Sequence, residues 1–244
     1  MAWQSKRRFG DTRIYKYSDD LFRVVYFKSG LAVKGYEDDD SGYKRSSPPG
    51  GGDRLDNNLI RAKSRVRELA LCNDFDWFVT FTLDGSKHDR YDLAAFKKEM
   101  AQFIRNQRRL KGGEWRYLLI PEQHQDGAWH MHGLMGGLPD GVVRTNANGY
   151  AELVPMAKKF GFTSLSAVKD KRRVASYITK YLTKDFGAGS EKNKHLFFSS
   201  QGLKGKELVS EGALCGDFHF DYENDWICSR WLTEKETANL PIKE

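Results

Sequence analysis

The sequence predicts an α+β protein with a central antiparallel sheet and flanking helices. Segments rich in β-branched and aromatic residues alternate with amphipathic segments of helical period, which is typical of this class. Residues 115–121 and 129–135 are apolar segments joined by the polar turn Gln125-Asp-Gly127, and such a hairpin requires antiparallel strands. With 244 residues, 39% of them hydrophobic and 13% aromatic, the chain is long and apolar enough to bury a core.

The first fifty residues differ in character from the rest of the chain. Residues 12–36 alternate between apolar and polar positions as short strands do, and Ser46-Ser-Pro-Pro-Gly-Gly-Gly-Asp53 has the composition of a linker. We therefore expect a β-rich N-terminal extension with its linker over residues 1–52, a main domain over residues 53–232 and a C-terminal tail over residues 233–244.

The main domain is expected to alternate helices and strands. Asp53 is placed to cap a helix, and Gly112-Gly113 is placed to end one. The segment Trp77-Phe-Val-Thr-Phe-Thr-Leu83 is most simply a buried strand. In chain order, the predicted elements are a helix at 53–71, a strand at 77–83, a helix at 91–110, the hairpin strands at 115–121 and 129–135, a short helix at 154–160, a helix at 169–184 and a β-rich segment from residue 196.

Charge and composition indicate a basic protein of the cytosol. The formal net charge is +7 and the pI is about 9.2, which favours a polyanionic partner. No amino-terminal run resembles a signal peptide, and no run approaches the roughly 18 apolar residues of a membrane span. Cys72, Cys215 and Cys228 show no C-x-x-C pairing, so we expect reduced core thiols.

His130-Met131-His132 is the first candidate for chemistry. Side chains alternate along a strand, so both imidazoles would point to one face and could hold a divalent metal ion. Two imidazoles seldom complete such a site, and Glu122 on the preceding strand is the expected third ligand, with His124 or Gln123 as the alternative. The competing interpretation is a pair of surface or hydrogen-bonded core histidines.

Tyr177 and Tyr181 are the second candidate. With Lys180 and Lys184 they fall within about 100° of arc on the predicted helix, beside an apolar packing stripe. A phenol is a poor nucleophile at neutral pH, but neighbouring ammonium groups favour the phenolate and can bind a phosphate. The competing interpretation is an ordinary amphipathic helix whose tyrosines line a core.

Taken together, these segments resemble the HUH endonucleases, and in particular the rolling-circle replication initiators of phages, plasmids and integrated bacterial elements. Phe78-Val-Thr-Phe-Thr-Leu-Asp84 is similar to the first family motif, and Glu122 with Gly127-Ala-Trp-His-Met-His-Gly133 is similar to the metal motif. Tyr177-Ile-Thr-Lys-Tyr-Leu-Thr-Lys184 is similar to the nucleophile motif in its two-tyrosine form. The tyrosines follow the histidines, as in replication initiators and transposases; in relaxases they come first. The resemblance covers about residues 75–186.

The resemblance implies a ferredoxin-like or RRM-like nuclease fold and a strand-cutting reaction. Mg²⁺ or Mn²⁺ would be held by His130, His132 and Glu122. Tyr177 would attack the scissile phosphate of single-stranded or melted origin DNA, giving a free 3′-hydroxyl and a 5′-phosphotyrosine link. Tyr181 would make the second cleavage, and the strands would then be rejoined.

The resemblance also implies partners and supporting residues. Lys180 and Lys184 would position phosphates or assist the nucleophile. No G-x-x-x-x-G-K-[ST] motif occurs, so a host helicase and the host replication machinery are the expected partners, in the cytoplasm of a bacterial cell and with no membrane. The candidate contacts to the DNA backbone are Arg105, Arg108, Arg109, Lys111, Lys171, Arg172 and Arg173.

Other interpretations of these residues remain open at this point. Each basic residue could instead be a solvated helix end, and Trp77, Trp115 and Trp129 are expected to pack in the core although they could stack on bases. A transposase would use the same chemistry. A DNA-binding replication regulator with a degenerate site would bind without cutting. A two-histidine hydrolase of small molecules would leave the basic charge and the tyrosine pair unexplained.

Overall fold

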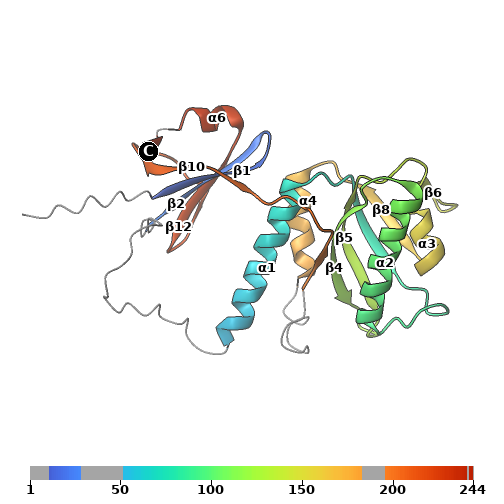
Figure 1. Ribbon diagram of the computed structural model, residues 1–244. Coiled ribbons are helices and arrows are strands. Elements are labelled where there is room, and N and C mark those ends of the chain that lie inside the picture. The colour runs from blue at the N-terminus through green and yellow to red at the C-terminus, as the bar shows by residue number, and fades with distance from the viewer. Residues whose placement is uncertain (1–10, 29–51, 183–195, 241, 244) are drawn as a thin grey trace, which may run out of the picture. The chain divides into compact units, whose positions relative to one another are not determined.

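The computed structural model describes residues 11–28, 52–182, 196–240 and 242–243 and divides the chain into two compact units (Figure 1). The terminal unit comprises Met1–Ser47 and Gly205–Glu244, and the central unit comprises Pro48–Lys204. Each unit is built on an antiparallel sheet, and the central unit adds helices on both faces of its sheet. The predicted α+β class is therefore confirmed. Among the helices of the described ranges, none is long and apolar enough to cross a lipid bilayer.

The terminal unit is a six-stranded sheet in the order β11-β12-β2-β1-β10-β13. Its core is formed by Ile14, Phe22, Val24 and Leu232, which are all buried. The elements are β1 (Thr12–Ser18), β2 (Leu21–Phe27), β10 (Glu207–Leu214), β11 (Tyr222–Glu223), β12 (Ile227–Leu232), the short helix α6 (Glu234–Ala238) and β13 (Ile242–Lys243).

The expected domain boundaries differ from this division. Residues 205–232 were assigned to the main domain and 233–244 to a tail, but both segments belong to the terminal unit. The reason is strand pairing: β10 pairs with β1 and β12 pairs with β2, so the C-terminal strands complete the sheet that the N-terminal hairpin begins. Such pairings join residues nearly 200 positions apart, as in Thr12 with Gly212, and hydropathy patterns do not reveal them.

The central unit is built on a seven-stranded sheet in the order β6-β7-β8-β3-β5-β4-β9. The predicted hairpin is present as β4 and β5, whose turn is closed by a hydrogen bond of 3.0 Å from the His124 amide to the Ala128 carbonyl. The strands are β3 (Trp77–Thr82), β4 (Arg116–Gln123), β5 (Trp129–Gly136), β6 (Val143–Thr145), β7 (Ala151–Leu153), β8 (Thr163–Ala167) and β9 (Phe198–Ser199).

The predicted helices of the central unit are also present. They are α1 (Gly52–Cys72), α2 (Leu93–Lys111), α3 (Val154–Phe160) and α4 (Lys171–Tyr177), and α4 continues as the 3₁₀ helix η1 (Ile178–Tyr181). The helix predicted over residues 169–184 therefore begins two residues later, where the Asp170 side chain accepts a hydrogen bond from the Arg173 amide. It also tightens after Tyr177, because η1 has 3₁₀ geometry.

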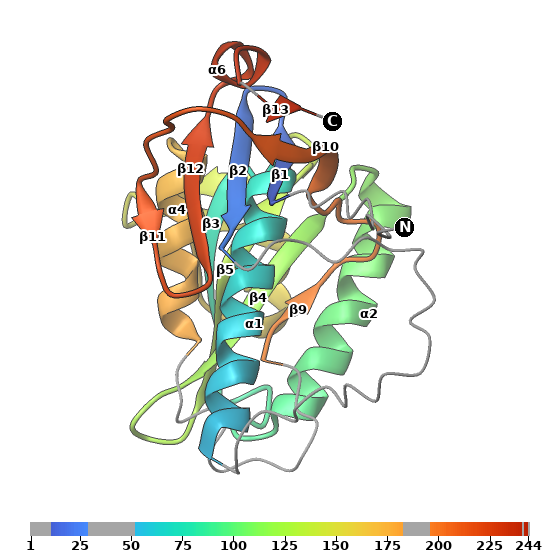
Figure 2. The same cartoon turned by 90° about the vertical axis from the view of Figure 1, so that its left-hand side faces the viewer.

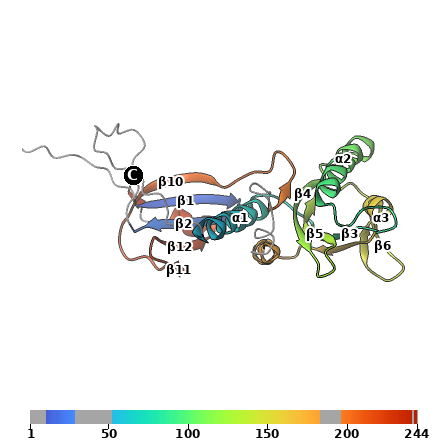
Figure 3. The ribbon, with the colours of Figure 1, turned by 90° about the horizontal axis from the view of Figure 1, so that it is seen from below.

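The helices divide between the two faces of the central sheet, as Figure 3 shows from below. The face that carries Val79 and Phe81 packs against Met100 and Ile104 of α2 and against Phe160 of α3. The opposite face carries α1 and α4, which contact each other and lie side by side in Figure 2. We call these the helix-α2 face and the helix-α4 face.

The three tryptophans behave as expected for core residues. Trp115 is fully buried and donates a hydrogen bond of 2.8 Å from its indole nitrogen to the Gly112 carbonyl. Trp77 and Trp129 are partly buried and pack against the core of the helix-α2 face. Core packing is thus the structural role of all three side chains.

Gly133 is the position on β5 where the sheet leaves no room for a side chain. It lies between His132 and Leu134, and a Cβ atom there would overlap the Leu118 carbonyl oxygen and lie 2.8 Å from Leu119 Cα. Both atoms belong to β4, the strand paired with β5. The close approach of the two strands, and with it the register that sets Glu122 opposite His130, therefore requires glycine at this position.

We predict that Gly133→Ala lowers the free energy of unfolding by about 3 kcal/mol, because two backbone strands must separate to admit the methyl group. Urea denaturation of the purified variant measures this change. Gly85→Ala is the matched control: the nearest atom to its Cβ would be Cδ of the flexible Arg90 side chain at 3.0 Å, so a loss well under half as large is expected. Equal losses in the two variants would contradict this explanation.

Candidate active site

His130 and His132 point to the helix-α4 face from the middle of the sheet, as their alternation predicts. On β3, Thr80 lies opposite His132 and Thr82 lies opposite His130. The Thr80 hydroxyl is 3.1 Å from Nδ1 of His132, and the Thr82 hydroxyl is 2.9 Å from Nδ1 of His130. Each threonine thereby orients one imidazole and leaves its Nε2 atom for another ligand, as supporting groups do around metal-binding histidines.

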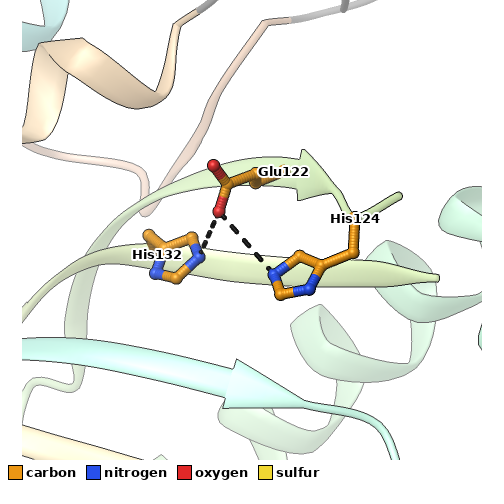
Figure 4. Close-up of side chains that lie close together, drawn as sticks. All are labelled: Glu122, His124 and His132. Atoms are coloured by element: carbon orange, nitrogen blue, oxygen red, sulfur yellow. Dashed lines mark ion pairs between the residues drawn. The ribbon is translucent and has the colours of Figure 1, made fainter. Parts of the chain in front are cut away.

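The carboxylate of Glu122 reaches the same place from β4. Its Oε2 atom lies 2.7 Å from Nε2 of His132 and 4.0 Å from Nε2 of His124 (Figure 4). Glu122, His124 and His132 offer three ligand atoms that all lie within 4.8 Å of one another. Figure 4 shows the carboxylate directed between the two imidazoles.

His130, one of the predicted ligands, lies beside this group but is not one of its three members. Its ring stacks on the His124 ring with 3.6 Å between centroids and 6° between planes. The structure therefore brings together all three predicted ligands and the alternative His124. The predicted pair His132 and Glu122 is in direct contact, and either imidazole of the stacked pair can supply the third ligand.

The chemistry of these donors fits a divalent cation. Nε2 of His132 is buried and has no hydrogen-bond partner, because its close contact with Glu122 does not have hydrogen-bond geometry. Burial lowers the pKa of His132 and outweighs the Glu122 carboxylate, which raises it. Burial also lowers the pKa of His130, assisted by the neighbouring His124. Neutral imidazoles with free Nε2 atoms next to a carboxylate are what a divalent metal ion requires.

The two predicted nucleophiles meet the histidines directly. The Tyr181 ring stacks on His132 with 4.2 Å between centroids and 10° between planes. The hydroxyl oxygens of Tyr177 and Tyr181 are 3.2 Å apart. Phe78 of β3 packs against both tyrosine rings, at 5.5 Å from Tyr177 and 6.1 Å from Tyr181. The metal-ligand candidates and the paired phenols therefore converge on one face of one sheet.

The environments of the two phenols differ. Tyr177 is 44% exposed, whereas Tyr181 is more enclosed. A hydrogen bond from the Lys180 side chain lowers the pKa of Tyr177, and a second one from Tyr181 lowers it further. Burial raises the pKa of Tyr181, as does its hydrogen bond to Tyr177. Tyr177 is thus the phenol better prepared to ionise.

Lys180 accounts for much of this asymmetry. Its ammonium group lies 3.7 Å from the centroid of the Tyr177 ring and 5.1 Å from that of the Tyr181 ring. The side chain is exposed, so the same cation is accessible to a phosphate that approaches the phenols. Lys184, the other predicted lysine, lies outside the described residues.

The predicted backbone contacts on α2 are on the other side of the sheet from this site. Arg105, Arg108, Arg109 and Lys111 belong to the helix that packs on the helix-α2 face. Arg108 has a structural role, since it donates a hydrogen bond of 3.1 Å to the Trp115 carbonyl. The sequence showed that this helix end is basic but did not show which face of the sheet it covers.

The basic cluster at the start of α4 lies on the same face as the tyrosines. Lys171 forms an ion pair of 2.7 Å with Asp74, while Arg172 and Arg173 are exposed in the first turn of α4. About two helical turns, at 3.6 residues per turn, separate this cluster from the phenols.

Sequence reasoning missed the two threonines and the stacking role of His124. The threonines did carry a signal, because Thr80 and Thr82 alternate with apolar residues along the predicted strand. That pattern places two hydroxyls on one face, but which histidines they meet follows only from the pairing of β3 with β5. No local pattern indicates the stack of His124 on His130.

The comparison with known families agrees with this geometry. Residues 76–186 match the family model of replication-associated proteins of the ORF2 type. No curated protein and no solved structure was found to match. The matched segment runs from the residue before β3 to a point just beyond η1, so it contains Thr80, Glu122, both histidines and both tyrosines. It is this segment of the chain that is similar to replication-associated proteins.

Proposed function

We propose that the protein initiates rolling-circle replication by nicking single-stranded or melted origin DNA and later rejoining the strands. The observation that carries this proposal is the contact of Tyr181 with His132, which sets two phenols against a carboxylate and imidazole group. The family match supports a role in replication, and the net charge of +7 supports a polyanionic substrate.

Glu122, His132 and His130 would hold Mg²⁺ or Mn²⁺, with His124 as the alternative third ligand. We prefer His130 because Thr82 orients its ring just as Thr80 orients His132. The bound ion would polarise the scissile phosphate and favour attack on phosphorus. The protein's own contribution is to keep the imidazoles neutral and fixed in direction, and the enclosing Tyr181 ring limits the access of water to His132.

Tyr177 is the nucleophile of the first cleavage in this proposal. Its oxygen would form a bond to phosphorus as the bond to the 3′-oxygen of the preceding nucleotide breaks. The phenolic proton is lost, the leaving oxygen takes up a proton, and the products are a free 3′-hydroxyl and a 5′-phosphotyrosine. Lys180 favours the phenolate form and can bind the phosphate at the same time.

Tyr181 would serve the second cleavage. While Tyr177 is free, Tyr181 donates a hydrogen bond to it and remains protonated. Once Tyr177 is esterified it no longer needs that hydrogen bond, and the second phenol is left beside the same candidate metal ligands. The free 3′-hydroxyl from the first cut can then attack one of the two phosphotyrosines and restore a continuous strand.

We predict that Tyr177→Phe lowers the rate of covalent protein–DNA adduct formation by at least about 10³-fold, because it removes the attacking oxygen. Tyr181→Phe should still form an adduct, since its ring can stack on His132 as before. A denaturing gel of a labelled origin-like oligonucleotide with Mn²⁺ measures both rates. Tyr150→Phe, at an exposed position on another loop, is the control. Adducts at the normal rate from the Tyr177→Phe/Tyr181→Phe double variant would refute the assignment.

We predict that Lys180→Ala shifts the pH profile of adduct formation to higher pH. The lysine lowers the pKa of Tyr177, so its loss raises that pKa and reduces the phenolate fraction at neutral pH. If the midpoint of the profile rises by one pH value, the rate on the rising limb should fall about tenfold. Single-turnover rates across the pH range measure the profile, and Lys180→Arg should keep the midpoint close to that of the wild type. An unshifted profile in Lys180→Ala would exclude this role.

We predict that His130→Ala weakens Mn²⁺ binding by more than about 100-fold, a loss larger than that expected for removing a supporting group. His124→Ala should weaken it less, and Thr82→Val should lower it by about 10- to 100-fold through the loss of the hydroxyl that orients His130. Isothermal titration calorimetry measures the affinities without reference to DNA. A larger loss in His124→Ala than in His130→Ala would identify His124 as the third ligand.

A further inference from the structure

The central unit has a second concave site, on the face opposite the histidines. A groove of about 490 Å³ lies between α2, α3 and the segment from Gly141 to Arg144. Phe103 and Val142 form part of its floor, and both belong to the apolar core of the helix-α2 face. The groove is therefore separated from the tyrosines by the thickness of the sheet, and the proposed reaction does not use it.

The rim of the groove is strongly basic. Lys111, Arg144, Lys158 and Lys159 line it, and no acidic residue is among the lining residues. Lys159 is 3.9 Å from the carboxylate of Glu99. Lys111, Arg144 and Lys158 form no ion pair within the described ranges of the chain, so the groove carries uncompensated positive charge. Cations gathered on one concave surface attract a polyanion, because each one that repels its neighbours is stabilised by a bound phosphate.

A buried amide indicates that the ligand has hydrogen-bond donors as well as anionic groups. Gln107 lines the groove, is only 9% exposed, and its Oε1 atom has no hydrogen-bond partner. A buried acceptor without a partner is unfavourable, and a ligand that donates a hydrogen bond to it removes the cost. Inorganic phosphate supplies charge but would leave the apolar floor uncovered.

We propose that this groove binds a nucleotide segment of single-stranded DNA away from the scissile phosphate. Phosphates would contact Lys111, Arg144 and Lys158, and a base would lie on Phe103 and donate a hydrogen bond to Gln107. The volume is within the range of roughly 300–1,000 Å³ that is typical of small-molecule sites, which suits a nucleotide better than a lone phosphate. The choice of DNA as the polyanion rests on the proposed function; the site itself rests on the groove.

This site binds without strong base selectivity. Every DNA base carries an N–H donor on its pairing edge, so one carbonyl oxygen does not distinguish among the four. Its role is to retain the strand on the protein while the other face cuts. It also gives Lys111, predicted from sequence as a backbone contact, a phosphate to bind on its own side of the sheet.

The test measures binding of single-stranded oligonucleotides of about 6 and about 30 nucleotides by fluorescence anisotropy. It uses the full chain carrying Tyr177→Phe/Tyr181→Phe in the absence of metal, so that the result is independent of cleavage. Adding Arg144→Ala/Lys158→Ala should weaken binding of the longer strand at least tenfold. It should also lower the slope of log affinity against log salt by about 1.4, which is 0.7 for each lost phosphate contact in a single strand.

The matched control is Lys98→Ala/Lys235→Ala, which removes the same charge from exposed lysines outside the groove. Circular dichroism and thermal unfolding show whether each variant is folded. Gln107→Leu, which leaves every charge in place, should weaken binding without altering the salt slope.

Three results would overturn the inference: equal losses in the groove and control variants, no binding of the longer strand by the parent protein, or saturation of the groove by inorganic phosphate with no effect on strand binding. These outcomes are distinct from failure of the proposed function. If the wild type binds single strands through the groove but forms no covalent adduct, the groove assignment stands and the nicking reaction does not. If adducts form but the groove variant binds like its control, the reverse holds.

Discussion

The contact on which the candidate site depends is the stack of the Tyr181 ring on the His132 ring, 4.2 Å apart and nearly parallel. It joins two chemical groups that are far apart in the chain, one on a strand in the middle of the sheet and one on the helical segment that crosses its face. Without it, the histidines would be an oriented imidazole pair and the tyrosines would be part of an amphipathic helix. The stack makes both neighbours in one candidate reaction centre, and Phe78 holds the phenols in place from β3.

The central sheet separates chemistry from stability by its two-residue alternation. On one side of β3 and β5, Val79, Phe81 and Met131 are buried in a core with α2 and α3. On the other side, the same strands present hydroxyls and imidazoles that satisfy each other at 2.9 and 3.1 Å. Polar groups can occupy the middle of a sheet only when they are paired in this way, since an unpaired one would be costly to bury. The exception is Nε2 of His132, which is buried and unpaired where a cation would bind.

The family match and the division into units describe the chain at two scales. The match to replication-associated proteins spans residues 76–186, entirely within the central unit, which runs from Pro48 to Lys204. That unit contains elements beyond the match at both ends: α1 contacts α4, and β9 pairs with β4 at one edge of the sheet. The terminal unit, built from both ends of the chain, lies wholly outside the matched segment. The proposed chemistry therefore belongs to the central unit, and the terminal unit has its own sheet and core.

The sequence by itself determined the elements and the direction of their side chains. The helix and strand periods, the turn at Gln125-Asp-Gly127 and the spacing of His130 with His132 and of Tyr177 with Tyr181 are local properties, and the structure confirms each of them. Only the tertiary structure decided which faces meet. Pairing of β3 with β5 brings the threonines to the histidines, pairing of β10 with β1 moves the C-terminal strands out of the predicted main domain, and packing of α2 places its basic end across the sheet from the phenols. These arrangements depend on contacts between residues far apart in the chain, whereas hydropathy periods record only the face on which each residue lies.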